Sequence, residues 1–378
     1  ISTVSQTYAK EIQTWQYGYG MDGILKSRKN VLSGIINGID YVTNDPATDK
    51  RIQVHFDADH LEGKAENKRL LQERLGLEQR DVPIIGMITR LADQKGLDIL
   101  SYVFDEMMCR DVQFVLLGTG ENRFEYLFRS MEERYRGRVS ANIFFDENLA
   151  QQIYAGSDMF LMPSLFEPCG LSQLISLRYG TVPLVRETGG LKDTVEPYNE
   201  FEHTGTGFSF HNYNAHEMLY MIRYAHKIYE LYPEEWLDII RRGMAMDFSW
   251  KKSSSKYAAI YDALIADEEK RMDEEEKRRA EQERLEQQRK EEELLMRMRL
   301  EKQLEREEEE RKRKEEETAK KKAAAAAKRK AAAAAKKKAA EEAAGKAEAK
   351  KADAGKAVKA AEKEKPVKKT KKTEPETK

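Results

Sequence analysis

Between residues 82 and 187 the sequence alternates short apolar runs with longer segments in which apolar positions recur three and four residues apart. Continuous apolar runs are typical of strands that are covered on both faces, and the three-and-four spacing is typical of amphipathic helices. The predicted strands are 82–90, 112–120, 139–145, 158–164 and 181–187, and the predicted helices between them are 96–108, 121–135, 147–156 and 170–180. This alternation predicts an α/β domain built on a doubly wound parallel sheet.

The two ends of the chain do not share this pattern. Residues 1–40 join a short β-rich start to an apolar stretch with turns at Gly34 and Gly38, which predicts the end of one domain and a linker into the next. Residues 214–265 add helical segments that Pro233 separates. We therefore assign residues 41–265 to the sheet domain.

The last third of the sequence is not globular in composition. From residue 266 to 318 it is nearly all Glu, Arg, Lys and Gln, and the acids often lie four residues before bases: Glu307 and Arg311, Glu308 and Lys312, Glu309 and Arg313, Glu310 and Lys314. Each such pair adds about 0.2 to 0.5 kcal/mol to an isolated helix. The leucines and methionines hold no heptad, so a charged single helix is favoured over a coiled coil. Residues 319–378 are Ala/Lys-rich, which predicts a disordered tail.

The net charge of −1 conceals two halves of opposite sign. Residues 1–266 hold 29 Lys and Arg against 37 Asp and Glu, whereas residues 267–378 hold 37 against 30. Residues 311–378 alone hold 25 basic and 11 acidic side chains. Such an excess would attract nucleic acid or another anionic surface without specifying one.

The chain contains two cysteines, Cys109 and Cys169, which are too few for a disulfide framework and indicate a reducing compartment. We therefore expect a cytoplasmic protein. The six histidines are scattered without metal-ligand spacing, so we predict no metal site and no cofactor. No apolar run approaches the length that crosses a bilayer.

Residues 163–174, PSLFEPCGLSQL, place one acid and one glycine between a predicted strand and a predicted helix. Ligands of open parallel sheets bind beyond the carboxyl ends of the strands, where helix N-termini offer unpaired amides to phosphate. Gly170, Leu171 and Ser172 would present such amides. Pro168 restrains the backbone of Glu167, so we expect its carboxylate to point into the cleft, although an isolated acid here could equally cap a helix.

Two cations and a second glycine turn follow other strands of the predicted sheet. Arg90 and Lys95 could hold a diphosphate, Arg by a bidentate fork and Lys as a point charge; the alternative is that both are solvated loop cations. Thr188, Gly189 and Gly190 form a glycine turn that likewise follows a predicted strand, at 181–187. Such a turn could also offer backbone amides to a ligand, although most Gly-Gly pairs only reverse the chain direction.

Three segments carry a resemblance to a known family. ITRLADQKGLD at 88–98, PSLFEPCGLSQL at 163–174 and VRETGGLKDTV at 185–195 resemble the C-terminal half of bacterial-type glycogen (starch) synthases. The resemblance covers about residues 2–264. It implies the Rossmann-like C-terminal domain of a two-Rossmann-domain glycosyltransferase, here followed by a long charged helix and a disordered tail. It also implies an ADP-glucose-dependent hexosyltransferase that extends the non-reducing end of an α-1,4-glucan with retention and releases ADP.

The resemblance also implies roles for single residues. Arg90 and Lys95 would bind the nucleotide phosphates, and Glu167 would hold hydroxyls of the donor glucose and help to stabilise a cation-like sugar. An aromatic ring, Phe145, would lie against the adenine. The remaining expected substrate-binding positions are Asn37, Cys169, Gly170, Leu171, Ser172, Thr188, Gly189 and Gly190. Cys169 is not expected to be a nucleophile.

This sequence departs from the wider pattern in ways that bear on the assignment. Related retaining families often have a second Glu eight positions after Glu167, where Ile175 stands here, and this fits the glycogen synthase branch. The family's acceptor-side domain, with its Lys-x-Gly-Gly-Leu motif, is not found in residues 1–378. We therefore expect an incomplete fragment that is inactive alone. Two alternatives are a non-catalytic nucleotide-sugar-binding fragment with a helical interaction tail and a glucan phosphorylase relative, which the missing pyridoxal-lysine context disfavours.

Overall fold

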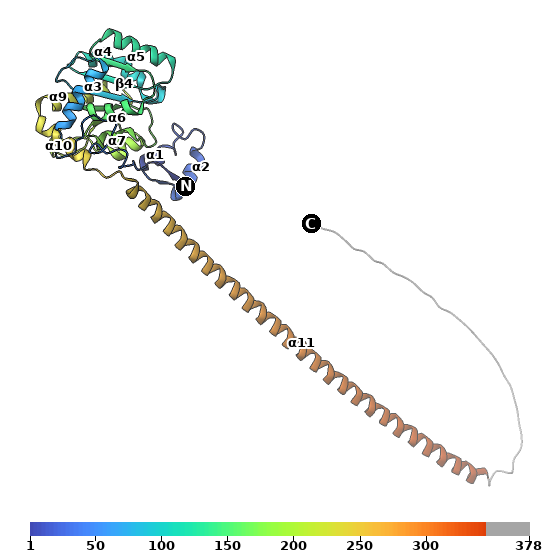
Figure 1. Cartoon of the computed structure of the whole chain (residues 1–378). Coiled ribbons are helices and arrows are strands. Elements are labelled where there is room, and N and C mark those ends of the chain that lie inside the picture. The colour runs from blue at the N-terminus through green and yellow to red at the C-terminus, as the bar shows by residue number, and fades with distance from the viewer. Residues whose placement is uncertain (345–378) are drawn as a thin grey trace, which may run out of the picture. The chain divides into compact units, whose positions relative to one another are not determined.

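The computed structural model describes residues 1–344 of the 378-residue chain, with the side chains of residues 1–336. The chain divides into two compact units, Ile1–Arg271 and Met272–Lys378 (Figure 1). The part of the predicted disordered tail from 345 to 378 lies outside the described residues.

Six parallel strands form the main sheet of the first unit, in the order β5-β4-β3-β6-β7-β8. The strands are β3 (Ile84–Ile88), β4 (Gln113–Leu117), β5 (Val139–Asn142), β6 (Met159–Met162), β7 (Val182–Arg186) and β8 (Phe208–Phe210). In β3, Ile84 lies opposite Gln113 of β4, and Ile85 lies opposite Met159 of β6. The chain thus runs outward from β3 to β5, returns to the other side of β3, and runs outward again to β8. The predicted doubly wound parallel sheet is confirmed.

Two details of the sheet differ from the prediction. Strand β8 has three residues, too few to show a period, and the sequence analysis did not predict it. Strand β4 ends at Leu117, three residues before the predicted end at 120, and β5 ends at Asn142, three residues before the predicted end at 145. The chain leaves the sheet there because Asp146 caps the next helix, accepting hydrogen bonds from the amides of Asn148 and Leu149.

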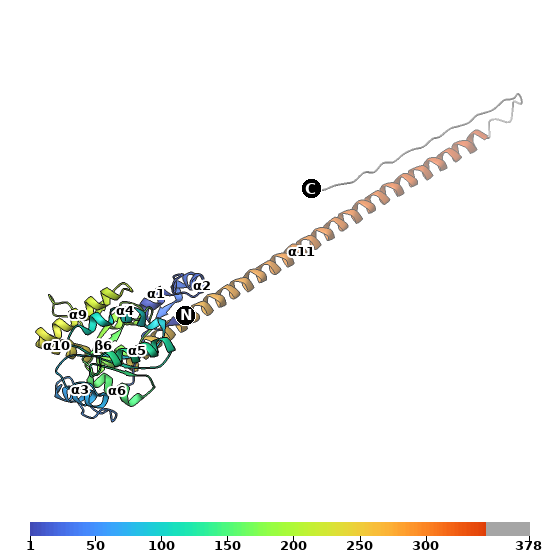
Figure 2. The same cartoon turned by 90° about the horizontal axis from the view of Figure 1, so that it is seen from above.

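Helices cover both faces of the sheet. The helices of the sheet domain are α3 (Glu62–Leu75), α4 (Leu97–Met108), α5 (Asn122–Arg134), α6 (Glu147–Gly156), α7 (Ser172–Arg178), α8 (Gly189–Thr194), α9 (Ala215–Leu231) and α10 (Pro233–Met244). Figure 2 shows α3 and α6 on one side of β6 and α4 and α9 on the other. Leu71 of α3 and Ile153 of α6 form a small apolar cluster with Ile84 and Val115 of the sheet.

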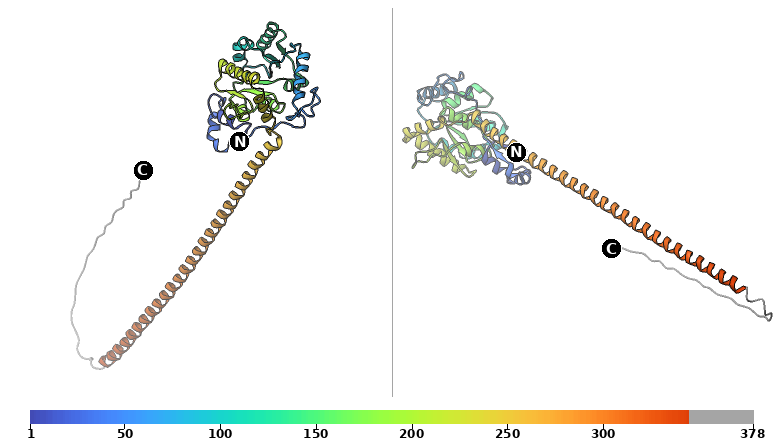
Figure 3. Two further views of the ribbon diagram at one scale, coloured as in Figure 1. Left: turned by 90° about the vertical axis from the view of Figure 1, so that its left-hand side faces the viewer. Right: turned by 90° about the horizontal axis from the view of Figure 1, so that it is seen from below.

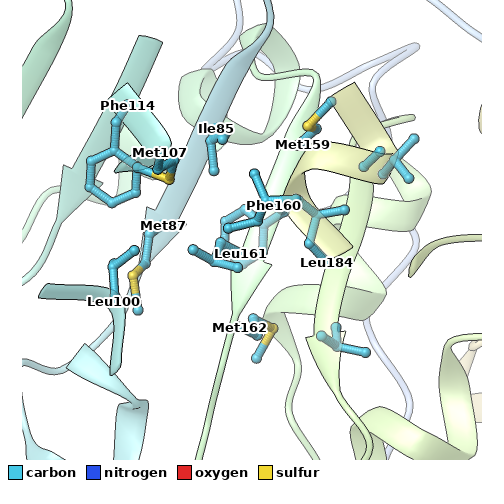
Figure 4. Close-up of a cluster of buried hydrophobic side chains, with 14 of the residues drawn as sticks. Ile85, Met87, Leu100, Met107, Phe114, Met159, Phe160, Leu161, Met162 and Leu184 are labelled. Carbon is cyan, nitrogen blue, oxygen red and sulfur yellow. The ribbon is translucent and has the colours of Figure 1, made fainter. Parts of the chain in front are cut away.

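The larger core lies between the sheet and α4, α5 and α9. Figure 4 shows Met87 and Phe114 of the sheet beside Leu100 and Met107 of α4, and all four side chains are buried. The ring of Phe114 also meets Phe104 of α4 edge to face, with 5.3 Å between the ring centroids. Each such side chain contributes about 1.5 to 3 kcal/mol by leaving water, so this core fixes the sheet beneath the loops that follow its strands.

The N-terminal residues pack against the sheet domain within the same compact unit. They form β1 (Ser2–Thr3), α1 (Gln6–Glu11), α2 (Asp22–Ser27), a 3-10 turn η1 (Lys29–Val31) and β2 (Ser33–Gly34), which pairs with β1. Helices α1 and α8 cap each other. Asp193 of α8 accepts hydrogen bonds from Ser5 Oγ at 2.6 Å and from the Thr7 amide at 3.0 Å. Glu11 of α1 accepts from Thr188 Oγ1 and the Gly189 amide, each at 3.0 Å.

Helix α11 (Trp250–Ala344) is longer than the predicted helix at both ends. It is continuous in Figures 1 and 3 and passes residue 318, where we expected disorder to begin. Alanine, the strongest helix former, dominates that stretch and explains the extension to Ala344. Two of the predicted ion pairs are present, Glu308 with Lys312 at 3.1 Å and Glu310 with Lys314 at 2.8 Å.

A buried lysine ties α3 to the ends of two other helices. Lys64 Nζ donates to the carbonyl oxygens of Ala155 and Tyr179, both at 3.0 Å, and to Thr181 Oγ1 at 2.7 Å. Carbonyls at helix C-termini have no partner within their own helix, so this ammonium group satisfies acceptors of α6 and α7 at once. The sequence alone gave no sign of this role, because all three partners are more than 90 residues away along the chain.

We predict that Lys64→Met lowers the free energy of unfolding of the first unit by about 3 kcal/mol or more, because each buried acceptor left without a donor costs about 1 to 3 kcal/mol. Urea unfolding followed by tryptophan fluorescence measures this loss. Lys26→Met is the control, since Lys26 is exposed on α2. Equal unfolding midpoints for the two variants would show that the Lys64 hydrogen bonds do not stabilise the fold.

Candidate functional site

The strongest candidate site lies where β3 and β6 end. These strands are neighbours, but the chain leaves β3 toward β4 and leaves β6 in the opposite direction toward β7. The loops that follow them therefore diverge, which is where open α/β sheets bind ligands. A cavity of about 460 Å³ opens between the loops. Its polar lining residues are Thr89, Arg90, Gln94, Lys95, Ser164, Glu167 and Ser172.

An ion pair lies at the centre of this cavity. Lys95 Nζ is 2.6 Å from Glu167 Oε2, and Ser164 Oγ donates to the same oxygen at 3.1 Å. The Glu167 side chain is 9% exposed and that of Lys95 is 18% exposed, so water reaches little of either group on the wall of the cavity. The structure thus brings together two of the three predicted catalytic residues.

Close backbone packing fixes the loop that carries Lys95. The 3-10 turn η2 (Asp93–Lys95) ends at Gly96, whose φ is +73°. A Cβ atom at Gly96 would lie 2.1 Å from the carbonyl oxygen of Pro163, so only glycine allows this approach. Gln94 closes the contact from the other side by donating its Nε2 to the Phe166 carbonyl at 2.9 Å. Gln94 and Ser164 were missed as site residues, although both lie inside the segments that carry the family resemblance.

Arg90, the third predicted catalytic residue, lies at the exposed mouth of the cavity. Its guanidinium meets Gln94 Oε1 at 3.5 Å, a marginal hydrogen bond, so most of its donors face solvent. A solvent-exposed guanidinium that lines the same cavity as the half-buried Lys95 can receive an anionic ligand with two acceptor oxygens.

The start of α7 offers backbone donors to the same cavity. Gly170 and Leu171 line it, and Gly170 has a φ of +67°, which turns the chain into the helix. Among the residues that the structure describes, the amides of Gly170, Leu171 and Ser172 donate to no protein acceptor. Free amides that share a cavity with Lys95 are typical of an anion-binding site, and binding of an anion there stays a prediction.

The Gly-Gly turn differs from the start of α7, because the amides of Gly189 and Gly190 already donate to protein acceptors. The Gly189 amide donates to Glu11 Oε1 at 3.0 Å, and the Gly190 amide donates to the Glu167 carbonyl at 2.9 Å. Cβ atoms at Gly189 and Gly190 would each lie 1.9 Å from a backbone carbonyl, of Glu167 and Cys169 respectively. This turn and Thr188 therefore support the Glu167 loop from behind. Glu11 was missed, because nothing local in the sequence pairs it with α8.

Cys169 is buried beneath the site and close to Asn37. Burial raises the pKa of the Cys169 thiol, although a backbone hydrogen bond from Asn37 acts in the opposite direction. A thiol with a raised pKa is a poor nucleophile near neutral pH. Neither Cys169 nor Asn37 lines the cavities at this end of the sheet, so their expected substrate-binding roles stay predictions.

A second cavity of about 350 Å³ adjoins the first. Both are lined by Ile88, Thr89 and Arg90, and the second also by Phe145, which is 83% exposed in the loop after β5. An exposed ring next to a cavity is available to stack on a flat ligand group. The two cavities together offer an aromatic end and a charged end, joined at Arg90.

No group of three or more His, Cys, Asp or Glu side chains that could hold a metal ion occurs in the described residues. None of the helices described is long and apolar enough to span a bilayer.

Comparisons with known proteins identify relatives of the sheet domain. Residues 72–233 match the family model for glycosyl transferases group 1. Over 266 residues, 70% of this chain, the sequence is 57% identical to a glycogen synthase of Lachnospira eligens and 54% identical to one of Lachnoclostridium phytofermentans. The match covers 56% of each relative, so the chain spans about half the length of the curated relatives it matches.

A solved structure gives the same relationship. The catalytic domain of starch synthase IV from Arabidopsis thaliana, bound to ADP and acarbose, superposes with a TM-score of 0.67 at 36% sequence identity. The superposition covers 70% of this chain and 55% of that one. The sheet domain described above is therefore a group 1 glycosyltransferase domain, related to the glycogen and starch synthases.

Proposed function

We propose that the first unit is the nucleotide-sugar-binding domain of a glycogen (starch) synthase, a hexosyltransferase that moves glucose from ADP-glucose to the non-reducing end of an α-1,4-glucan with retention. The ion pair of half-buried Lys95 and buried Glu167, in one cavity with the free amides of α7, carries this proposal. The identity to named glycogen synthases and the ADP bound by the starch synthase neighbour support the choice of substrates.

The diphosphate end of the donor would bind Lys95, Arg90 and the amides of residues 170–172. Negative charge grows on the diphosphate as the bond to glucose breaks, and prepositioned donors in a water-poor cavity stabilise that charge without reorganisation. Lys95 is already oriented by its 2.6 Å contact with Glu167. Arg90, at the mouth, is free to close on the phosphates.

The sugar end would lie against Glu167. Its carboxylate accepts from Lys95 and Ser164, and a carboxylate with two oxygens retains capacity for a donor hydroxyl. A fixed negative charge there also stabilises positive charge on the sugar in the transition state. The adenine would stack on Phe145 in the adjoining cavity.

The glucan acceptor would be held largely by the part of the relatives that has no counterpart in this chain, since the match covers 56% of their length. We place the protein in the cytoplasm, where Cys109 and Cys169, both free, stay reduced. A chain that binds ADP-glucose without catalysis is the alternative.

We predict that Lys95→Met weakens ADP binding and that Glu167→Gln does not. Losing a charged donor to phosphate costs about 1.5 to 3 kcal/mol, so Lys95→Met weakens ADP binding by about 10- to 100-fold. Glu167→Gln removes a negative charge near the diphosphate and releases Lys95, so affinity is unchanged or higher. Isothermal titration calorimetry measures both dissociation constants.

Lys192→Met is the control for these variants, because Lys192 is half-exposed on α8 and does not line the cavity. It should leave ADP binding within a factor of three of the parent. A Lys95→Met variant that also stays within that factor would remove the phosphate role of Lys95.

We predict that the 378-residue chain binds ADP but transfers no glucose to glycogen. Holding two substrates in a productive orientation supplies about 7 to 11 kcal/mol of barrier reduction, and a chain without the acceptor-binding half forfeits most of it. Calorimetry with ADP and a transfer assay with radiolabelled ADP-glucose, on one preparation, test this. Measurable glucan extension would show that the acceptor site lies within these residues, whereas absence of ADP binding would contradict the proposed site itself.

A further inference from the structure

The charge balance of α11 changes sharply after Glu317. Residues 267–317 hold 16 basic and 22 acidic side chains, and many are joined one helical turn apart, such as Glu286 with Lys290 and Glu310 with Lys314, each at 2.8 Å. Across the boundary, Glu317 pairs with Lys321 at 2.7 Å. Residues 318–340 hold nine Lys and Arg and no acid. Their positive charge is therefore uncompensated within the segment.

The basic residues of this segment recur with a fixed spacing. Triplets begin at Lys320, Lys328 and Lys336, and five alanines separate each triplet from the next. The three adjacent residues of a triplet cover about 200° of the helix circumference. Successive triplets begin eight residues apart, so each lies about 12 Å further along the axis and is rotated by about 80° from the one before. Positive charge thus surrounds most of the helix at regular intervals along its axis.

We propose that residues 320–336 bind the phosphate backbone of double-stranded nucleic acid without regard to sequence. We call residues 320–336 the basic helix. It carries seven positively charged side chains, six of lysine and one of Arg329. Lysine contacts phosphate as a point charge, and the segment contains no Asn or Gln that would read a base edge.

The dimensions of the basic helix suit a duplex groove. An α-helix with its side chains is about 10 to 12 Å wide, and the major groove is about 12 Å wide. The alanine runs keep the helix narrow between the triplets. Because each triplet faces more than one side, lysines can reach phosphates on both walls of the groove.

An anionic membrane is a poorer partner for the same segment. Helices that lie on membranes bury a face of large apolar residues such as Leu, Phe or Trp. Between residues 305 and 344 alanine is the only apolar residue type. Attraction to lipid would then rest on charge alone, whereas a duplex carries one negative charge per about 1.7 Å of its axis.

Fluorescence anisotropy with the full chain and two labelled 24-base-pair duplexes of unrelated sequence tests the proposal. We expect equal affinities for the two duplexes within threefold. Each neutralised phosphate contributes about 0.9 to the slope of log affinity against log salt concentration, so seven charges predict a slope of about −6 or steeper. Replacing Lys320, Lys321, Lys322, Lys328, Arg329, Lys330 and Lys336 by Gln should make the slope shallower by about 6.

A matched control removes the same number of charges from the compensated part of α11. It carries Gln at Lys270, Arg271, Lys277, Arg278, Arg284, Arg289 and Lys290, and we expect its salt slope to stay close to that of the parent. Glutamine and lysine have similar helix propensities, so circular dichroism should show equal helicity in all three proteins.

Three outcomes would overturn the proposal: a parent slope shallower than about −3, an equal loss of slope in the control, or tighter binding to vesicles with 30% phosphatidylserine than to the duplexes at the same salt concentration. The proposal does not depend on the glycosyltransferase assignment, because ADP binding by the first unit is measured separately.

Discussion

Strand β3 hydrogen-bonds to β4 on one side and to β6 on the other, although about 75 residues separate β3 from β6 in the sequence. A parallel pair needs a long crossover connection, and β4, β5 and their helices make up the connection between β3 and β6. The site depends on the same contact. Lys95 follows β3 and Glu167 follows β6, so their 2.6 Å ion pair is available only when these two strands are adjacent.

The parts of the fold with a clear period were predictable from the sequence. Strands β3, β4, β6 and β7 are continuous apolar runs, and the helices between them show the three-and-four spacing. Strand β8 was not predictable, because three residues carry no period and its pairing to β7 is set by tertiary packing. The N-terminal 40 residues read as a linker, since the caps that tie them to α8 join residues more than 170 positions apart.

The site was predictable to a similar degree and for a similar reason. Glu167, Arg90, Lys95 and the glycines lie in segments whose local pattern marks a strand end, and the cavity collects most of them. Gln94, Ser164 and Glu11 act through contacts with distant backbone or with another site residue, which no single segment reveals. In α11 the error had the opposite origin: low complexity indicated disorder, yet alanine makes the same stretch strongly helical.

The reciprocal caps of α1 and α8 have a consequence for cooperativity. Each helix is six residues long, well below the roughly 12 to 15 residues at which an isolated helix becomes marginally stable in water. Each also receives an N-terminal acceptor from the other: Asp193 serves α1, beside its own N-cap Ser5, and Glu11 serves α8. Each helix therefore loses an N-terminal partner when the other unfolds, which couples the opening of the two. Unfolding of α1 removes the Glu11 acceptor from the turn that packs against the backbone of Glu167, so local order at the N-terminal segment is coupled to local order at the Glu167 loop.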